Sequence, residues 1–303
     1  KVLLSNKVNY WTGQECREFE KEFAQFAGTK HAVAVANGTV ALDLALKALG
    51  IGTGDDVIVT SRTFLASASS IVTAGANPVF ADVELDSQNI SRRTIEAVLT
   101  TNTKAIICVH LAGWMCDMDP IMQLAEENGI WVIEDCAQAH GAFYNGQSAG
   151  SIGHIGAWSF CQDKIMTTGG EGGMVTTNDE NLWKKMWSYK DHGKNFDSIY
   201  NKQHPPGFRW LHDSFGTNWR MMEMQAVIGR LQLQKMPEWT QLRNTNMHRV
   251  LASFENNPYF TVAKPPANYI HAAYKAYVQV NTAQLPEGWS RDRIMAEINA
   301  LGV

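Results

Sequence analysis

Residues 31–60 read HAVAVANGTVALDLALKALGIGTGDDVIVT, in which two short apolar runs flank a helical pattern. The runs HAVAVA (31–36) and DVIVT (56–60) have the length and the valine and isoleucine content of buried strands. Between them, apolar residues recur at helical spacing from Thr39 to Leu49. This order of strand, helix and strand is typical of the units that build a parallel sheet.

The same alternation continues beyond residue 60. Further strand-like runs are PVFAD (78–82), KAIICV (104–109), WVIED (131–135), IGAWSFC (155–161) and GMVTT (173–177). Helical spacing recurs from Asp119 to Glu127 and again from about Asn181 to Asp191. The sequence therefore predicts an α/β fold with a mostly parallel sheet between helices, and ligands are expected at the carboxyl ends of its strands.

The second half of the chain is less regular. Residues 193–217 are rich in aromatic side chains, contain Pro205-Pro206 and show no sustained period, which predicts a long loop. Helical periodicity resumes at Trp219. We expect a large domain over residues 1–235, then a linker helix and the start of a smaller C-terminal domain over 236–303. The chain begins without Met and its last helical pattern stops without a following element, so we expect this small domain to be incomplete.

Composition excludes several classes of partner. The net charge is −4 and no Lys/Arg run is longer than Lys184-Lys185, which argues against nucleic acid and anionic lipid. The longest apolar run, residues 105–116, contains His110 and is too short to span a bilayer, and the N-terminal apolar stretch is too short for a signal peptide. Five cysteines without a C-x-x-C pair indicate reduced, mostly buried thiols, so a cytoplasmic protein is expected.

Three short segments carry candidate chemistry. Asn37-Gly38-Thr39 joins a strand to a helix, where free N–H groups bind anions, although a simple N-cap explains the same residues. Asp135 ends a strand and suits a general base, the partner of a protonated ring nitrogen or a capping carboxylate. A metal site is not predicted, because Asp135, Cys136 and His140 have no regular ligand spacing. Lys164 follows a strand and precedes the glycine-rich TTGGEGG (167–173), which suits an amine that forms a Schiff base, although most lone lysines are solvated.

Together these segments form a longer series of motifs. In order they are ANGTVALDLALKALGIGTGDDVIVT (36–60), RTF (62–64), VHLAG (109–113), IEDCAQAHG (133–141), SFCQDK (159–164), GGEGGMV (169–175), DHG (191–193) and GTNWRM (216–221). Over about residues 15–255 the chain resembles the DegT/DnrJ/EryC1/StrS aminotransferases. This resemblance implies a fold-type-I enzyme dependent on pyridoxal 5′-phosphate (PLP), acting as a homodimer without a metal. It also implies transfer of an amino group, with glutamate as the expected donor, to a nucleotide-linked keto-deoxysugar in surface-polysaccharide or amino-sugar biosynthesis.

The resemblance also implies roles for individual residues. Lys164 is similar to the family's Schiff-base lysine, and Asp135 to the carboxylate that pairs with the pyridine nitrogen. Phe64 resembles the aromatic residue stacked on the ring, and Gln138 the residue beside the phenolic oxygen. The residues that resemble phosphate contacts are Gly38, Thr39, Ser159 and, from the neighbouring subunit, Asn218.

The expected chemistry agrees with these roles. A carboxylate at Asp135 keeps the pyridine nitrogen protonated, and the charged ring accepts the electrons left when the donor loses its α-proton. Lys164 first carries the cofactor and then moves protons, while the cofactor alternates between PLP and its pyridoxamine form. For this, the pKa of Lys164 is expected to fall below its usual value through burial and a nearby pyridinium.

The sequence is compatible with more than one reaction and with more than one role for the aromatic loop. The triplet Cys161-Gln162-Asp163 differs from the residues that most often precede this lysine in the family. The carboxylate of Asp163 is expected to alter the electrostatic field at Lys164. Another PLP reaction on the same scaffold (a sugar dehydratase, a decarboxylase or a desulfurase) and a non-catalytic regulatory protein are the alternatives, although Lys164 stands where some dehydratases carry histidine. The aromatic loop offers stacking surfaces for a nucleotide or sugar, or packs as a lid or dimer contact.

Overall fold

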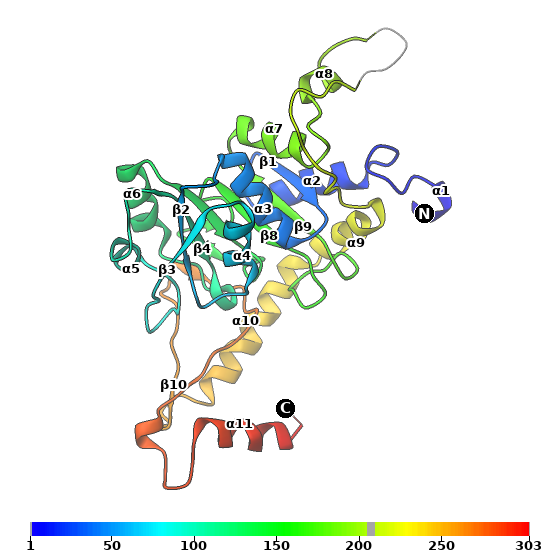
Figure 1. Cartoon of the computed structure of the whole chain (residues 1–303). Coiled ribbons are helices and arrows are strands. Elements are labelled where there is room, and N and C mark those ends of the chain that lie inside the picture. The colour runs from blue at the N-terminus through cyan, green and yellow to red at the C-terminus, as the bar shows by residue number, and fades with distance from the viewer. Residues whose placement is uncertain (1, 205–209, 303) are drawn as a thin grey trace.

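The computed structural model describes residues 2–204 and 210–302. Within these ranges the centre of the molecule is a seven-stranded sheet with the order β1-β9-β8-β5-β4-β2-β3 (Figure 1). Its strands are β1 (His31–Val35), β2 (Asp56–Thr60), β3 (Asn77–Ala81), β4 (Thr103–Val109), β5 (Trp131–Asp135), β8 (Ile155–Ser159) and β9 (Gly173–Thr177). Only β9 runs against its neighbours, so the prediction of a mostly parallel sheet is confirmed.

Alternate strand residues serve two apolar layers, one on each face of the sheet. In β1, Ala32 and Ala34 belong to one layer, and Val33 and Val35 to the other. The first layer is completed by α2 (Glu15–Phe26), α5 (Arg92–Glu96), α6 (Met118–Asn128) and α9 (Glu223–Leu233). The second layer is completed by α3 (Gly38–Leu49), α4 (Ala66–Thr73) and α7 (Glu180–Tyr189). Because both faces are covered, the strands are apolar without alternation, as parallel strands usually are.

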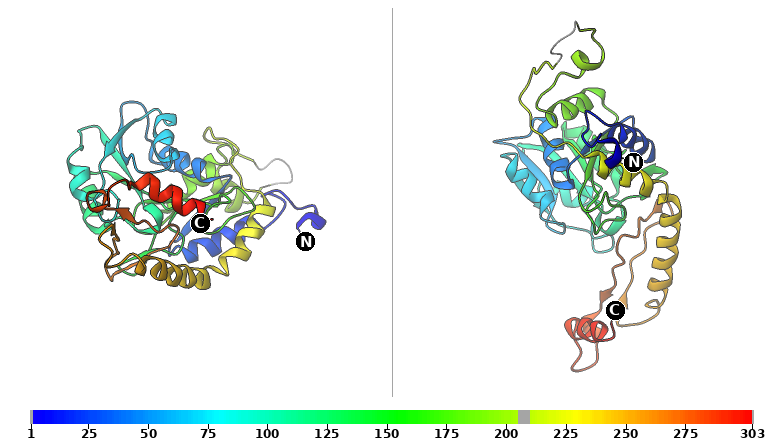
Figure 2. Two further views of the ribbon diagram at one scale, coloured as in Figure 1. Left: turned by 90° about the horizontal axis from the view of Figure 1, so that it is seen from below. Right: turned by 90° about the vertical axis from the view of Figure 1, so that its right-hand side faces the viewer.

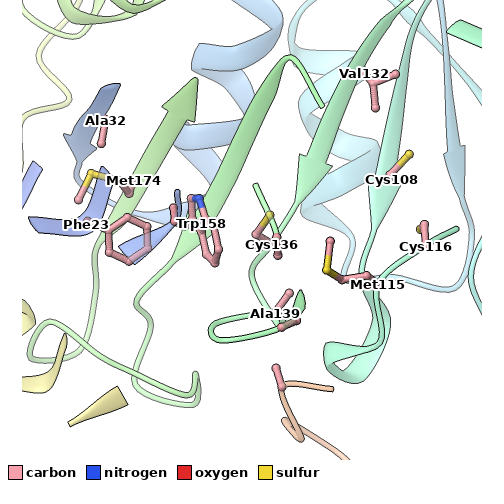
Figure 3. Packing of buried hydrophobic residues seen from close by; sticks show 14 of the residues in the cluster. Phe23, Ala32, Cys108, Met115, Cys116, Val132, Cys136, Ala139, Trp158 and Met174 are labelled. Atoms are coloured by element: carbon pink, nitrogen blue, oxygen red, sulfur yellow. The ribbon is translucent and has the colours of Figure 1, made fainter. Parts of the chain in front are cut away.

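Figure 3 shows the first of these layers from close by. Phe23 of α2 packs edge-on against Trp158 of β8, with ring centroids 5.1 Å apart. Cys108, Cys116 and Cys136 lie in the same layer. The five cysteines are unpaired and four are buried, which confirms the expectation of mostly buried thiols.

The segment beyond the sheet is extended. Helix α10 (Met236–Ala252) leads away from the sheet, and α11 (Arg291–Ala300) lies at the far end of the molecule (Figures 1 and 2). Between them are β10 (Phe260–Thr261), β11 (Tyr269–Ile270), β12 (Gln279–Val280) and the 3-10 helix η2 (Thr282–Gln284). Strand β11 returns to pair with β6 (Phe143–Tyr144), which also pairs with β7 (Gln147–Ser148). A domain boundary between residues 235 and 236 stays a prediction, and it coincides with the start of α10.

Some expected details were wrong. The loop predicted over 193–217 contains a short helix, α8 (Phe196–Tyr200), because the side chain of Asn195 caps it by accepting a 2.7 Å hydrogen bond from the N–H of Ser198. The expected strand 155–161 ends at Ser159, and Cys161 forms an isolated bridge with Gly170. Pro205, Pro206 and Phe208 lie outside the described residues.

Two short elements complete the description, α1 (Val2–Ser5) and the 3-10 helix η1 (Leu111–Gly113). None of the helices in residues 2–204 and 210–302 combines the length and the apolar character that crossing a bilayer requires.

Candidate active site

A cavity of about 560 Å³ opens where the parallel strands β1, β4, β5 and β8 end. Because these strands share a direction, residues that follow them meet at one edge of the sheet. Among the residues that line the cavity are Gly38, Thr39, Phe64, Asp135, Gln138, Ser159 and Lys164. Of the eight residues predicted for this site, the structure thus brings seven together.

One wall of the cavity is the N-terminus of α3. The side chain and the carbonyl of Asn37 accept from the N–H groups of Val40 at 3.0 Å and Ala41 at 3.2 Å. Within the described residues, the N–H groups of Gly38 and Thr39 have no acceptor, as expected for the first turn of a helix. Asn37 is therefore a cap and yet leaves an anion site beside it, so the two readings of this segment are compatible.

Ser159 closes the same wall. A Cβ added to Gly38 would lie 2.5 Å from the Cβ of Ser159, a distance that real side chains do not adopt. The end of β8 therefore packs against the backbone of Gly38 and leaves no room for a larger residue. This packing explains why glycine follows Asn37 and places the Ser159 side chain next to the free N–H groups.

Asp135 is buried at the end of β5. Its Oδ2 accepts a 2.7 Å hydrogen bond from the hydroxyl of Ser67, and its Oδ1 accepts from the N–H of Ala137 at 3.1 Å. Burial raises the pKa of Asp135, and these hydrogen bonds together with the positive charge of Lys164 oppose it, with a net rise. The carboxyl group is thus held in one orientation by two hydrogen bonds.

Ser67 was missed by the sequence reading. It lies on α4, is fully buried, and its hydroxyl is also 2.8 Å from that of Thr63. The available signal was the spacing of Ser67 and Ser70, two serines that α4 turns inward. Serines at helical spacing are common on solvated helix faces, so this signal does not identify a site by itself.

Lys164 lies after β8 with its side chain mostly buried. Its Nζ is 3.1 Å from Oδ2 of Asp163 and 5.3 Å from the centre of the Tyr274 ring. Burial lowers the pKa of Lys164, but its hydrogen bond to Asp163 and the charge of that carboxylate raise it more, so the net pKa lies above its usual value. The carboxylate of Asp163 stabilises the ammonium form in the protein without cofactor, whereas the fall expected beside a pyridinium stays a prediction.

The remaining predicted residues have distinct positions. Oε1 of Gln138 accepts a 2.6 Å hydrogen bond from the N–H of Ala112, which ties the loop after β5 to the loop after β4. Phe64 is 71% exposed at the cavity mouth, so its ring is free to contact a bound ring. Asn218 is exposed, forms an isolated bridge with Asp191 and does not line the cavity of its own chain.

Glu134, the acidic neighbour of Asp135, does not line the cavity. Glu134 points to the opposite face and is fully buried, with its carboxylate 2.8 Å from Nε2 of His110 and 2.9 Å from the N–H of Gly150. In the described part of the chain, His110, Glu134 and Cys136 are the residues whose potential metal-ligand atoms lie within 4.8 Å of one another. Hydrogen bonds within the protein account for the buried position of Glu134, so this cluster needs no ion.

The aromatic loop mainly packs within the chain. Phe196 lies edge-on to Trp187, with ring centroids 5.0 Å apart, and Tyr200 is 5.8 Å from the same ring. Trp210 packs 4.5 Å from Trp11. Phe215, by contrast, is fully exposed. Phe196, Tyr200 and Trp210, which were considered for substrate stacking, are therefore used in internal contacts.

Comparisons with known proteins identify the family of this chain. The DegT/DnrJ/EryC1/StrS aminotransferase family model matches residues 1–303. GDP-perosamine synthase of Caulobacter vibrioides is 41% identical over 94% of this chain and 74% of its own length. A UDP-N-acetyl-3-dehydro-α-D-glucosamine 3-aminotransferase of Acidithiobacillus ferrooxidans is 38% identical over 99% and 76%. An aminotransferase structure from Psychrobacter cryohalolentis is 63% identical, with a TM-score of 0.98 over 100% of this chain and 78% of that one. The chain thus belongs to the DegT/DnrJ/EryC1/StrS aminotransferase family.

Proposed function

We propose that this chain is a PLP-dependent transaminase that moves an amino group from an amino-acid donor, expected to be glutamate, to a nucleotide-linked keto sugar. The observation that carries the proposal is the cavity itself, which Lys164, Asp135 and the free N–H groups of α3 all line. Aminotransferases of this family use PLP. The two relatives described above are named for GDP-linked and UDP-linked sugars, which supports a nucleotide-linked acceptor.

The residues of the cavity fit PLP. The N–H groups of Gly38 and Thr39, with the hydroxyl of Ser159 beside them, would hold the phosphate group, because a helix N-terminus attracts anions. Asp135 would pair with the ring nitrogen, and Lys164 would provide the amine that binds the aldehyde. Phe64 and Gln138 would contact the face and the phenolic edge of the ring. These assignments are proposals, and the cavity of about 560 Å³ has room for such a molecule.

When bound, PLP supplies a protonated ring that accepts the electron pair left at the donor's α-carbon. Asp135, fixed by Ser67 and Ala137, holds the proton at the ring nitrogen. Lys164, once free, would accept the α-proton of the donor on Nζ and deliver it to the former aldehyde carbon of the cofactor. The mostly buried position of Lys164 keeps bulk water away from this proton.

The decisive experiment loads the purified protein with PLP and adds glutamate. A transaminase converts the cofactor to its pyridoxamine form, and the visible absorbance of the bound aldehyde disappears. Nucleotide-linked keto sugars are then screened for the one that restores the absorbance. A decarboxylase, a desulfurase or a dehydratase would not complete this cycle, and a regulatory protein would not start it.

We also propose a homodimer with shared sites. Asn218 does not line its own cavity and is exposed, as a residue donated to a partner would be. Large apolar side chains are exposed in the segments that contain Phe64 and Asn218, namely Phe64, Leu65, Leu211, Phe215 and Met222. Such exposed side chains suit a protein interface.

The free thiols of the chain further support a cytoplasmic location.

A further inference from the structure

Asp163 and Tyr274 surround the amine of Lys164. Oδ2 of Asp163 is 3.1 Å from Lys164 Nζ and accepts a 2.8 Å hydrogen bond from the hydroxyl of Tyr274. The ring of Tyr274 lies 5.3 Å from the same Nζ, within the range of cation–π attraction. A carboxylate and an aromatic face thus both favour the charged form of this amine.

Tyr274 is far from Asp163 in sequence but is fixed in place by backbone contacts. Its N–H donates to the carbonyl of Ala112 at 3.0 Å, and the N–H of Ala272 donates to the carbonyl of Gly113 at 2.9 Å. Ala112 and Ala273 have φ values of 59° and 52°, which alanine rarely adopts. We call the contact between residues 112–113 and residues 272–274 the junction. Backbone held in such a conformation indicates that the junction is tightly constrained by its surroundings.

The junction is also connected to the cavity. Gln138, which lines the cavity, accepts from the N–H of Ala112, and the carbonyl of Ala112 accepts from Tyr274. The side chain of Tyr274 then reaches Asp163. The position of the Asp163 carboxylate is therefore set from two directions, by its own backbone next to Lys164 and by the segment that follows α10.

We propose that Asp163, oriented by the hydroxyl of Tyr274, is a positioning residue that holds Lys164 Nζ in its charged form at the cavity and so sets how readily this amine reacts. The importance of this control for catalysis rests on the proposed function of Lys164. A lysine that alternately carries the cofactor and moves a proton needs both its neutral and its charged form. Asp163 stabilises the charged form whenever the amine is free.

Other charged or titratable groups surround this amine. Asp135, Glu171 and Cys161 line the same cavity, the charge of Lys164 influences buried His140, and Lys275 lies over the Tyr274 ring. Within the described residues, the acidic side chain in direct contact with Lys164 Nζ is that of Asp163. Glu171 is a matched control, because its carboxylate lines the same cavity without touching the lysine.

The test measures the reactivity of Lys164 against pH in the full chain without cofactor. Trace acetylation with acetic anhydride, followed by mass spectrometry of the Lys164 peptide, reports the fraction of neutral amine, with exposed Lys104 as internal reference. In Asp163→Asn, labelling of Lys164 is expected to rise several-fold near pH 8 and to reach its midpoint at lower pH. Tyr274→Phe is expected to shift in the same direction by less, and Asp163→Glu to restore the wild-type profile.

Glu171→Gln is expected to leave the midpoint nearly unchanged. The proposal is overturned if the Asp163→Asn profile matches that of Glu171→Gln or moves to higher pH. Separate borohydride trapping of PLP on the wild-type chain tests the role of Lys164 itself. A shifted acetylation profile without trapping on Lys164 would reject the proposed function and retain the contact, whereas trapping with an unshifted profile would reject only the role of Asp163.

Discussion

The hydroxyl of Ser67 donates a 2.7 Å hydrogen bond to Oδ2 of Asp135, although the two residues lie 68 positions apart in the chain. Ser67 belongs to α4 and Asp135 to the end of β5, so a helix on one face of the sheet orients a carboxylate at its edge. With the N–H of Ala137 on the other oxygen, both carboxylate oxygens are engaged. The direction in which Asp135 presents its charge is therefore fixed by the fold.

Asp135→Asn is expected to bind PLP but to transaminate at least about 100-fold more slowly, because an amide does not hold the ring nitrogen protonated by charge. Ser67→Ala, which keeps the carboxylate and loses its orientation, should slow the reaction by less. The half-reaction with glutamate is followed by stopped-flow absorbance. Turnover of Asp135→Asn at the wild-type rate would remove Asp135 from this role.

Lys164→Ala is expected to lose the covalent link to PLP and the associated visible absorbance. Within the described residues, Lys164 is the lysine that lines the cavity, so no other amine should replace it. Borohydride reduction of the loaded wild-type protein, followed by peptide mapping, identifies the labelled residue. A label on any other lysine would contradict the assignment.

Gly38→Ala is expected to weaken PLP binding by roughly tenfold or more, since its Cβ would lie 2.5 Å from that of Ser159 and displace one wall of the phosphate site. Gly52→Ala is the matched control, because the nearest atom to its added Cβ is 3.7 Å away. Binding is measured by fluorescence titration of the cofactor-free protein. Equal affinities for the two variants would argue that Gly38 is not part of the site.

Mixing Lys164→Ala with Asn218→Asp tests the shared site. If Asn218 serves the partner's cavity, a mixed dimer has one site with both lesions and one with neither. Random exchange makes about half the dimers mixed, so activity should recover to roughly a quarter of wild type. Subunit exchange and the inactivity of each variant alone are verified first.

If Asn218 instead serves its own chain, every site in every dimer carries a lesion and mixing restores nothing. That result would reject the shared-site proposal and leave the assignment of Lys164 intact. A monomer in solution, by sedimentation, would have the same consequence.

His140 provides a prediction about stability. It is fully buried between Trp158 and Phe160, and burial, with the charge of Lys164, lowers its pKa to about 3. Unfolding lets this histidine take up a proton below its usual pKa of roughly 6.5, so stability falls as pH decreases from there toward 3. Between pH 7 and 5.5 this one group should cost the folded state about 1 kcal/mol.

His140→Leu should lack this part of the pH dependence, since leucine does not titrate. Urea unfolding of both proteins at pH 7 and pH 5.5 gives the comparison, in which the contribution of buried His271 cancels. An identical loss of stability in the two proteins would show that His140 is not protonated on unfolding.

Local patterns in the sequence were enough to predict the sheet and the edge of it at which the candidate residues gather. Strands such as Trp131–Asp135 and Gly173–Thr177 were predicted with their observed bounds, because strands buried on both faces are continuously apolar and end abruptly. Parallel strands end at one edge, so Asp135 and Lys164 were expected to meet there, and they do line one cavity. Helix α8 was missed, because five residues carry too little periodicity.

What the sequence determined by itself is the order of strands and helices and the residue types at the strand ends, since both depend on neighbours within a few positions. Only the tertiary structure decided which distant side chains orient the residues at the strand ends. Ser67 orients Asp135, and Tyr274 reaches Asp163 across 111 positions. The rise in the pKa of Lys164 in the protein without cofactor has the same origin. Its sign depends on whether burial or a contacting carboxylate dominates, and only packing places that carboxylate at 3.1 Å.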